Sequence, residues 1–193
     1  MEIQGGIITA TGGICAPGIG SGFDGYCGNI TITSGITRVT ARTTETTSDF
    51  SIDCIGRGNG GTCGTVTIGD MVFYDGSTYK NHGDDYIARR ELSVACINTA
   101  TVEVGNGEFC LIFGNGNATD HAFGLAASST AVLSNVHIER PGRCVNCVQN
   151  NTSYITLKDG TTNKLISTGD NALRVGDAGT TLIINGESAG TGK

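Results

Sequence analysis

The chain contains the stretch Gly18-Ile-Gly-Ser-Gly-Phe-Asp-Gly-Tyr-Cys-Gly-Asn-Ile-Thr-Ile32, which aligns without gaps on Cys54-Ile-Gly-Arg-Gly-Asn-Gly-Gly-Thr-Cys-Gly-Thr-Val-Thr-Ile68. The offset is 36 residues, and eight of the fifteen aligned positions are identical. The identical residues include two isoleucines, a cysteine and a threonine, which a Gly-rich chain would not readily place in one register by chance. An internal period of this length is typical of an architecture in which each repeat forms one structural unit.

The pattern inside the repeat indicates β-structure. Ile30-Thr-Ile32 and Val66-Thr-Ile68 alternate branched apolar and hydroxyl residues, as a strand with one buried face does. The intervening glycines allow a positive φ where the chain turns a corner. We therefore predict an all-β fold, a single-stranded right-handed parallel β-helix (β-solenoid), with equivalent positions stacked about 4.8 Å apart. Ile19 should lie over Ile55, and Ile32 over Ile68.

The second half of the chain follows the same logic with less identity. Three of its segments combine a small or apolar corner with an alternating strand: 122–138, 144–157 and 172–184. When these segments are anchored on Leu125, Val148 and Val175, the steps are 23 and 27 residues. We expect coils of this length in a parallel β-helix.

Two stretches depart from this pattern. Residues 42–50 are polar, and we interpret them as a loop that lengthens the second coil. Residues 84–97 are the best helical candidate, as a short link between the halves. Because the composition changes there, we predict one domain over residues 1–193 with a soft boundary near residue 88. It separates Gly- and Thr-rich coils (1–87) from more divergent coils (88–193).

Three Gly- and Thr-rich stretches carry a family likeness: Gly-Gly-Ile-Ile-Thr-Ala-Thr-Gly-Gly (5–13), Gly-Ile-Gly-Ser-Gly (18–22) and Cys-Gly-Asn-Ile-Thr-Ile-Thr-Ser-Gly-Ile-Thr-Arg-Val-Thr-Ala (27–41). They resemble the repeats of Gly-rich bacterial cell-surface proteins, some of which are classed as carbohydrate-binding right-handed β-helix domains. The resemblance is specific over residues 5–75 and generic afterwards. It implies a surface location, polysaccharide binding and, in some members, calcium. No matched site motif transfers ligand residues to individual positions.

Composition and charge exclude several classes of function. Glycine supplies 31 of the 193 residues, charged residues make up 16%, and the net charge is −6. Without a basic stripe the chain is not expected to bind nucleic acid, and it has no apolar run long enough for a membrane span. The N-terminal sequence has no secretion signal, so an exported protein would begin after its signal or be an excised piece. We expect an extracellular or bacterial cell-surface location.

The cysteines form an even set: Cys15, Cys27, Cys54, Cys63, Cys96, Cys110, Cys144 and Cys147. Eight cysteines allow about 105 connectivities. Our working pairing joins neighbours in sequence (Cys15–Cys27, Cys54–Cys63, Cys96–Cys110 and Cys144–Cys147), and a link between the stacked Cys27 and Cys63 competes with it. Cys144-Val-Asn-Cys147 has the spacing of a redox or zinc half-site but lacks a second such motif. We interpret the set as buried thiols or as structural disulfides, which would imply an oxidising compartment.

The densest collection of ligand-binding residue types lies in residues 71–86. Sugar sites place aromatic rings against C–H faces and use carboxylates and amides to accept hydrogen bonds from hydroxyls. The plainer interpretation is a turn with solvated acids and with tyrosines that cover an edge. The candidate glycan ligands in this stretch are Tyr74, Asp75, Tyr79, His82, Asp84, Asp85 and Tyr86.

Calcium is the candidate cofactor. It binds six to eight oxygens from carboxylates, amides and backbone carbonyls. Asp84 and Asp85, and Asp120 in the loop Asn115-Gly-Asn-Ala-Thr-Asp120, would supply some of these oxygens. Neither stretch matches an EF-hand loop or a Gly-Gly-x-Gly-x-Asp repeat.

An enzymatic alternative centres on His137, Glu139 and Arg140, with Arg143 nearby. Polysaccharide hydrolases use paired carboxylates, whereas lyases use a basic residue with calcium. Strand alternation places His137 and Glu139 on the same side, opposite Ile138. A solvated strand face that ends in a Pro-Gly turn explains these residues equally simply.

Three functions therefore remain open. The leading hypothesis is a non-catalytic glycan-binding or adhesin module. The second is a structural solenoid stalk or phage-fibre segment without a ligand, which would show an uncapped apolar end and could form oligomers by stacking. The third is a polysaccharide lyase or hydrolase.

Overall fold

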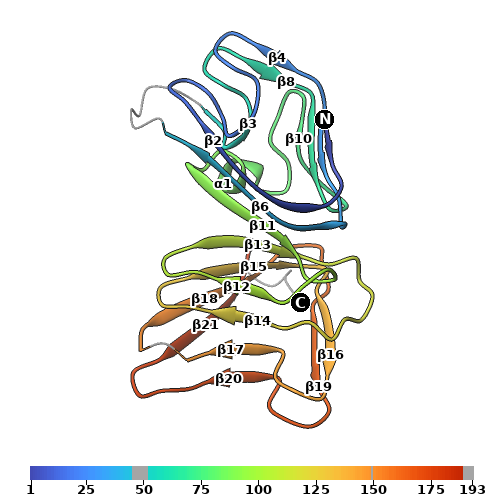
Figure 1. Cartoon of the computed structure of the whole chain (residues 1–193), viewed down its shortest axis with the longest axis vertical. Helices are drawn as coiled ribbons and strands as arrows, with labels where there is room; N and C mark the ends of the chain where they lie inside the picture. The colour runs from blue at the N-terminus through green and yellow to red at the C-terminus, as the bar shows by residue number, and fades with distance from the viewer. Residues whose placement is uncertain (45–51, 149, 189–193) are drawn as a thin grey trace. The chain divides into compact units, whose positions relative to one another are not determined.

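Figure 1 shows the computed structural model of the chain, whose regular secondary structure consists almost entirely of short β-strands. The structure describes residues 1–44, 52–148 and 150–188. The chain divides into two compact units, Met1–Ser93 and Val94–Lys193. The predicted polar loop at residues 42–50 lies mostly outside the described residues, and its first two residues end a strand. No described helix has the length and apolar character that a membrane span requires.

The elements of the first unit are β1 (Glu2–Ile3), β2 (Gly6–Gly12), β3 (Ile19–Gly20), β4 (Tyr26–Cys27), β5 (Ile30–Ile32), β6 (Ile36–Thr43), β7 (Ile55–Gly56), β8 (Thr62–Cys63), β9 (Thr65–Ile68), β10 (Met71–Asp75), α1 (Gly83–Tyr86) and β11 (Glu91–Cys96), the last of which crosses the boundary between the units. Strands β2 and β6 pair in parallel, with Thr9 opposite Thr40. The sheet order is β1-β5-β9-β10, and β3-β7 and β4-β8 form separate two-stranded sheets.

The two copies of the repeat stack in the predicted register. Ile19 pairs with Ile55 in the parallel pair β3–β7, and Ile32 pairs with Ile68 in β5–β9. Gly20 shows why the aligned glycines are needed, because its φ is +150° and an added Cβ would lie 1.9 Å from the backbone oxygen of Gly56. The predicted stacking of Ile19 over Ile55 and of Ile32 over Ile68 is therefore confirmed.

The coil pattern ends at a hairpin directly after the second repeat. Strand β10 runs antiparallel to β9, with Met71 opposite Ile68. The two residues between these strands are Gly69, which has a φ of +62°, and Asp70. A Gly-led two-residue loop is a typical hairpin connection because its twist matches that of the flanking strands. This reversal makes the sheet mixed.

The predicted helical link at residues 84–97 is largely wrong. The structure has one helical turn, α1, followed by β11. Leu92, Val94 and Cys96 are all buried in this strand. The apolar residues that suggested a helix follow the period of two that a strand requires, and the strand's remaining residues are also mostly buried.

The strands of the second unit are β12 (Val102–Val104), β13 (Phe109–Phe113), β14 (Phe123–Leu125), β15 (Thr130–Ser134), β16 (His137–Arg140), β17 (Val145–Cys147), β18 (Thr152–Leu157), β19 (Lys164–Ser167), β20 (Leu173–Val175) and β21 (Thr181–Gly186). Strands β12-β14-β17-β20 form one parallel sheet, β13-β15-β18-β21 follow one another in parallel, and β16 pairs with β19.

The register of the second unit corrects one predicted anchor. Leu125 pairs with Cys147, and Cys147 pairs with Val175, so the steps are 22 and 28 residues rather than 23 and 27. Val148 follows the strand instead of lying in it. Adjacent strand residues point to opposite faces, so the buried Cys147 occupies the inward position that had been assigned to valine.

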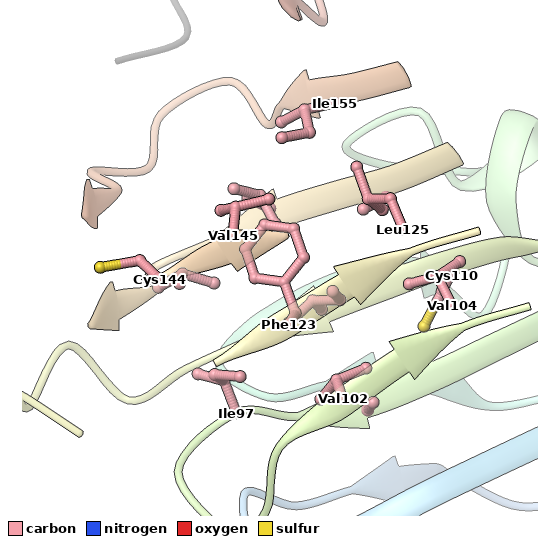
Figure 2. Packing of buried hydrophobic residues seen from close by; sticks show 14 of the residues in the cluster. Ile97, Val102, Val104, Cys110, Phe123, Leu125, Cys144, Val145 and Ile155 are labelled. Atoms are coloured by element: carbon pink, nitrogen blue, oxygen red, sulfur yellow. The ribbon is translucent and has the colours of Figure 1, made fainter. Parts of the chain in front are cut away.

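The core of the second unit is apolar and includes three cysteines (Figure 2). Phe123 is 1% exposed, and Leu125 from the same strand is 3% exposed. Burying side chains of this size stabilises a fold by about 1.5–3 kcal/mol each. The cluster consists of Ala95, Ile97, Val102, Val104, Cys110, Ile112, Phe123, Leu125, Ala131, Leu133, Val136, Ile138, Cys144, Val145, Cys147 and Ile155.

The prediction of one right-handed parallel β-helix over the whole chain is wrong. The fold is mostly β, as expected, but the strands form several separate sheets, one of them mixed. The hairpin at Gly69 and Asp70 reverses the chain, and the one-turn helix follows it. Register stacking of the repeat was correctly predicted, whereas its continuation as a single solenoid was not.

Candidate functional site

The predicted glycan ligands at residues 71–86 have very different environments. Tyr74 is 4% exposed and Tyr86 is 3% exposed. The Tyr86 ring packs edge-on against Phe73, with ring centroids 5.6 Å apart. The two tyrosine rings are therefore part of the interior of the first unit and present almost no surface to a sugar.

Tyr79 belongs to a hydrogen-bonded cluster with Asp53 and Arg57. Its hydroxyl donates to Asp53 Oδ1 at 2.5 Å, and Arg57 Nε donates to Asp53 Oδ2 at 3.2 Å. Arg57 Nη2 also donates to the Tyr79 hydroxyl. The guanidinium carbon lies 5.0 Å from the ring centroid of Tyr74 and 4.9 Å from that of Tyr79, in cation–π geometry. Burial, together with the hydrogen bond to Asp53, raises the pKa of Tyr79.

The cluster of Asp53, Arg57 and Tyr79 has a structural role, because its polar groups satisfy one another where Asp53 is buried. Asp53 is 1% exposed, and its two oxygens bind the tyrosine and the arginine. A buried carboxylate needs such partners, because an uncompensated charge is costly. Sequence reasoning missed Asp53 and Arg57. The signal that could have found them is the repeat itself, in which Arg57 stands at the position of Ser21.

The remaining polar residues of the stretch are exposed. Asp75 accepts hydrogen bonds from the backbone nitrogens of Ser77 and Thr78, at 2.9 and 2.8 Å, and lies 3.0 Å from Lys80 Nζ. These interactions hold the pKa of Asp75 well below its usual range, and the hydrogen bond from the Thr78 backbone contributes most. Asp75 therefore organises a turn.

His82 Nδ1 lies 3.2 Å from Asp85 Oδ2, at the start of α1. Asp84 and Asp85 are exposed on this helical turn. The third calcium candidate, Asp120, is exposed in the second unit, so the three carboxylates come from different units. Calcium binding stays a prediction.

The residues of the enzymatic alternative lie on β16. The predicted alternation is confirmed, since Ile138 is buried between the half-buried His137 and the exposed Glu139. His137 Nε2 is 3.8 Å from Glu139 Oε2, and among the described residues neither that nitrogen nor Arg140 Nε has a hydrogen-bond partner. Arg143, in contrast, is paired with Asp170 at 3.1 Å. The catalytic role of His137, Glu139 and Arg140 stays a prediction.

An exposed aromatic turn in the first repeat was not anticipated from the sequence. We define the aromatic turn as residues 22–26, in which Phe23 is 62% exposed and Tyr26 is 75% exposed. The nitrogen of Gly25 donates to the oxygen of Gly22 at 3.1 Å, and Asp24 has a φ of +48°. The conformation is thus set by a backbone turn rather than by burial of the rings.

An equivalent turn in the second repeat lies directly beside the aromatic turn and is hydrogen-bonded to it. There the nitrogen of Gly61 donates to the oxygen of Gly58 at 3.0 Å, and Gly60 has a φ of +68°. The turns are joined by hydrogen bonds from Asp24 N to Asn59 O at 2.9 Å and from Thr62 N to Gly25 O at 2.8 Å. Strands β4 and β8, which follow the turns, lie side by side in Figure 1. The aromatic turn therefore has a fixed backbone.

Polar groups accompany the two exposed rings. The Asp24 carboxylate lies over Gly60, where an added Cβ would be 1.9 Å from its Oδ1. The aligned positions of the second repeat carry Asn59 in place of Phe23 and Thr62 in place of Tyr26. This difference between otherwise matched repeats is the sequence signal that would have revealed the aromatic turn, because structural constraints shared by the two copies do not require aromatic residues there.

The second unit carries a row of polar side chains across a parallel sheet. We define the polar row as Glu103, Gly124, Asn146 and Arg174, which are successive register partners on β12, β14, β17 and β20. The Glu103 carboxylate lies over Gly124, since an added Cβ there would be 2.1 Å from its Oε2. Asn146 Oδ1 is buried and has no hydrogen-bond partner within the part of the chain that the structure describes. Glu103, Asn146 and Arg174 thus lie in register across this sheet.

None of the eight cysteines is in a disulfide. The four predicted neighbour pairs are therefore not bonded in this structure. Cys54, Cys63, Cys96, Cys110, Cys144 and Cys147 are buried, and Cys15 and Cys27 are partly exposed. Burial is the largest cause of the raised pKa of Cys54, which is about 12.

Comparison with protein-family models, with curated proteins and with solved structures finds no match for this chain.

Proposed function

We propose that the chain is a non-catalytic glycan-binding or adhesive module of the cell surface or extracellular space, and that the aromatic turn makes the contact. The supporting observation is the exposure of Phe23 and Tyr26, three residues apart on a hydrogen-bonded turn. Exposed aromatic rings present flat apolar area and lose little conformational entropy on binding. They suit the C–H face of a pyranose ring.

The surrounding polar groups favour a sugar over a purely apolar ligand. Asp24 lies between Phe23 and Tyr26 in the aromatic turn, and its carboxylate would accept hydrogen bonds from hydroxyl groups. The net charge of −6 disfavours acidic polysaccharides unless a cation bridges the charges. A neutral glycan is therefore the ligand class that we propose. The chain has no Trp, so we expect weak affinity for each module, raised by multivalency.

A glycan array probed with and without calcium tests this function. We expect the full chain to retain a set of neutral glycans, and Tyr26→Ala to weaken that binding about tenfold through loss of ring contact. Phe23→Ala should act in the same direction. Tyr154→Ala is the matched control, because Tyr154 is also an exposed aromatic residue, at 39%, but lies in the other unit.

The outcomes separate the competing functions. Binding to no glycan under either condition would end the proposal. Equal losses for Tyr26→Ala and Tyr154→Ala would remove the aromatic turn as the contact, and loss on Arg174→Ala alone would move the contact to the polar row. Shortening of a bound polysaccharide, abolished by His137→Ala, would favour the lyase or hydrolase.

A ligand-free structural role is the second candidate, and the last strands of the second unit favour it. Strands β20 and β21 are edge strands, and Leu173, Val175 and Ile184 on them are 37%, 49% and 48% exposed. Apolar edge strands associate readily with other chains. Sedimentation velocity over a range of concentrations tests this role. Self-association that is abolished by Val175→Lys supports it, and a monomer at every concentration contradicts it.

A further inference from the structure

Cys27 and Cys63 occupy equivalent positions in the two repeats and are direct neighbours in the structure. They are Cα partners in the parallel pair β4–β8. Hydrogen bonds from Thr62 N to Gly25 O at 2.8 Å and from Gly64 N to Cys27 O at 3.0 Å hold this register on both sides. Neighbouring strands lie about 4.8 Å apart, within the range of about 4.4–6.8 Å that disulfide-bonded Cα atoms show.

The register directs the two side chains to the same face of the pair, and each thiol influences the pKa of the other. The Cys27 thiol donates to the Gly56 oxygen at 3.9 Å. Cys27 is partly exposed, whereas Cys63 is 3% exposed. We propose that Cys27 and Cys63 form a disulfide under oxidising conditions, as a modification site that cross-links the two copies of the repeat. This inference does not depend on glycan binding.

Four of the other cysteines have register partners or hydrogen bonds that do not involve a second cysteine. Cys110 is opposite Ala131 in β13–β15, and Cys147 is opposite Leu125 and Val175. The Cys144 thiol donates to the Ile166 oxygen at 3.3 Å. The partner that the sequence had suggested for Cys63 was Cys54, whose backbone nitrogen donates to Ile87 O at 2.7 Å, outside the β4–β8 register.

The reaction needs an oxidant, for which a small disulfide such as oxidised glutathione suffices. The more accessible Cys27 thiolate attacks one glutathione sulfur, which forms a mixed disulfide and releases the first glutathione thiolate. The Cys63 thiolate then attacks the Cys27 sulfur and releases the second. Two cysteine thiols are oxidised, one glutathione disulfide is reduced, and the two cysteine protons end on the two glutathione molecules.

Burial makes this reaction slow at neutral pH. It raises the pKa of Cys27 and raises that of Cys63 to about 12. Only the thiolate is a nucleophile, so the rate should rise about tenfold for each pH unit between about pH 7 and 8.5.

Peptide mapping tests the proposal on the full chain. The protein is reduced, freed of reductant, incubated with oxidised glutathione without denaturant, quenched with acid and digested at acidic pH, where thiol–disulfide exchange is slow. We expect a cross-linked peptide that contains Cys27 and Cys63 and is lighter than its two components by two hydrogens. Cys54→Ser should leave this peptide unchanged, and Cys63→Ser should leave glutathione attached to Cys27.

Three results would overturn the proposal. The first is a Cys54–Cys63 or Cys15–Cys27 peptide as the main product. The second is a stable glutathione adduct on Cys27 in the unsubstituted chain, and the third is a Cys27–Cys63 peptide that forms only after denaturant is added. The readout uses the unsubstituted chain, so a variant that failed to fold would not affect its interpretation.

Discussion

Asp53 is a buried residue of the first unit on which several polar contacts converge. Its carboxylate accepts from the Tyr79 hydroxyl, from Arg57 Nε and, at 2.9 Å, from the Arg57 backbone nitrogen. The arginine in turn lies against the rings of Tyr74 and Tyr79. This arrangement ties the start of the second repeat to β10 and the residues that follow it, which the repeat pattern alone does not join.

Removing the Asp53 carboxylate should therefore be costly. Asp53→Ala leaves Arg57 and Tyr79 without their shared acceptor, and we expect a loss of about 3–5 kcal/mol in unfolding free energy, the range for breaking one side of a buried ion pair. Asp53→Asn, which keeps the shape and one acceptor oxygen, should cost less. Urea denaturation measures both changes. A loss below about 1 kcal/mol for Asp53→Ala would contradict the structural role.

Tyr79 should make the stability of the first unit sensitive to alkaline pH. Its pKa is raised in the folded state, so the folded chain holds the phenol proton more tightly than the unfolded chain does. The contribution is complete below the unfolded pKa of about 10 and is lost as pH rises through the higher folded value. Denaturation midpoints measured from pH 8 to 11 should fall more steeply for the wild type than for Tyr79→Phe. Parallel pH dependences for the wild type and Tyr79→Phe would contradict a raised pKa of Tyr79 in the folded state.

At the scale of elements, the close approach of Gly20 to Gly56 makes the repeat intolerant of side chains. Gly20→Ala combines an unfavourable φ with a Cβ 1.9 Å from the Gly56 oxygen. We expect it to lower the unfolding free energy by at least about 2 kcal/mol. Gly28→Ala is the matched control, because an added Cβ there meets nothing within 4 Å. Equal effects of the two substitutions, measured by thermal denaturation, would contradict the stacked register.

The elements also show what the sequence can and cannot predict. The repeat predicts the pairs Ile19–Ile55 and Ile32–Ile68, because identical residues at one offset fall in one register. The reversal after Ile68 was missed, although Gly69-Asp70 between two apolar runs is a hairpin signal. Cys147 was passed over for Val148 because a buried cysteine behaves as a small apolar residue.

The candidate site was the harder prediction for a physical reason. The stretch at residues 71–86 has the residue types of a sugar site, but burial decides whether a ring can be used, and Tyr74 and Tyr86 are buried. From the sequence alone, Phe23 and Tyr26 resemble the buried apolar residues of a strand-rich chain. Only the turn geometry places them in solvent.

At the scale of the whole molecule, the two compact units carry different features. The first has the aromatic turn and the Cys27–Cys63 pair, and the second has the polar row and the exposed edge strands β20 and β21. A net charge of −6 over 193 residues disfavours contact with acidic ligands. The stacked turns of the first unit are the feature on which the proposed function depends.

An NMR titration tests this dependence most directly. The isotope-labelled full chain would be titrated with a neutral glycan retained on the array, and backbone amide shifts followed for every assigned residue. We expect the largest changes in residues 22–26 and smaller ones in the stacked residues 58–62, with Tyr26→Ala removing both. Changes centred on residues 71–86, or on the polar row of the second unit, would contradict the account.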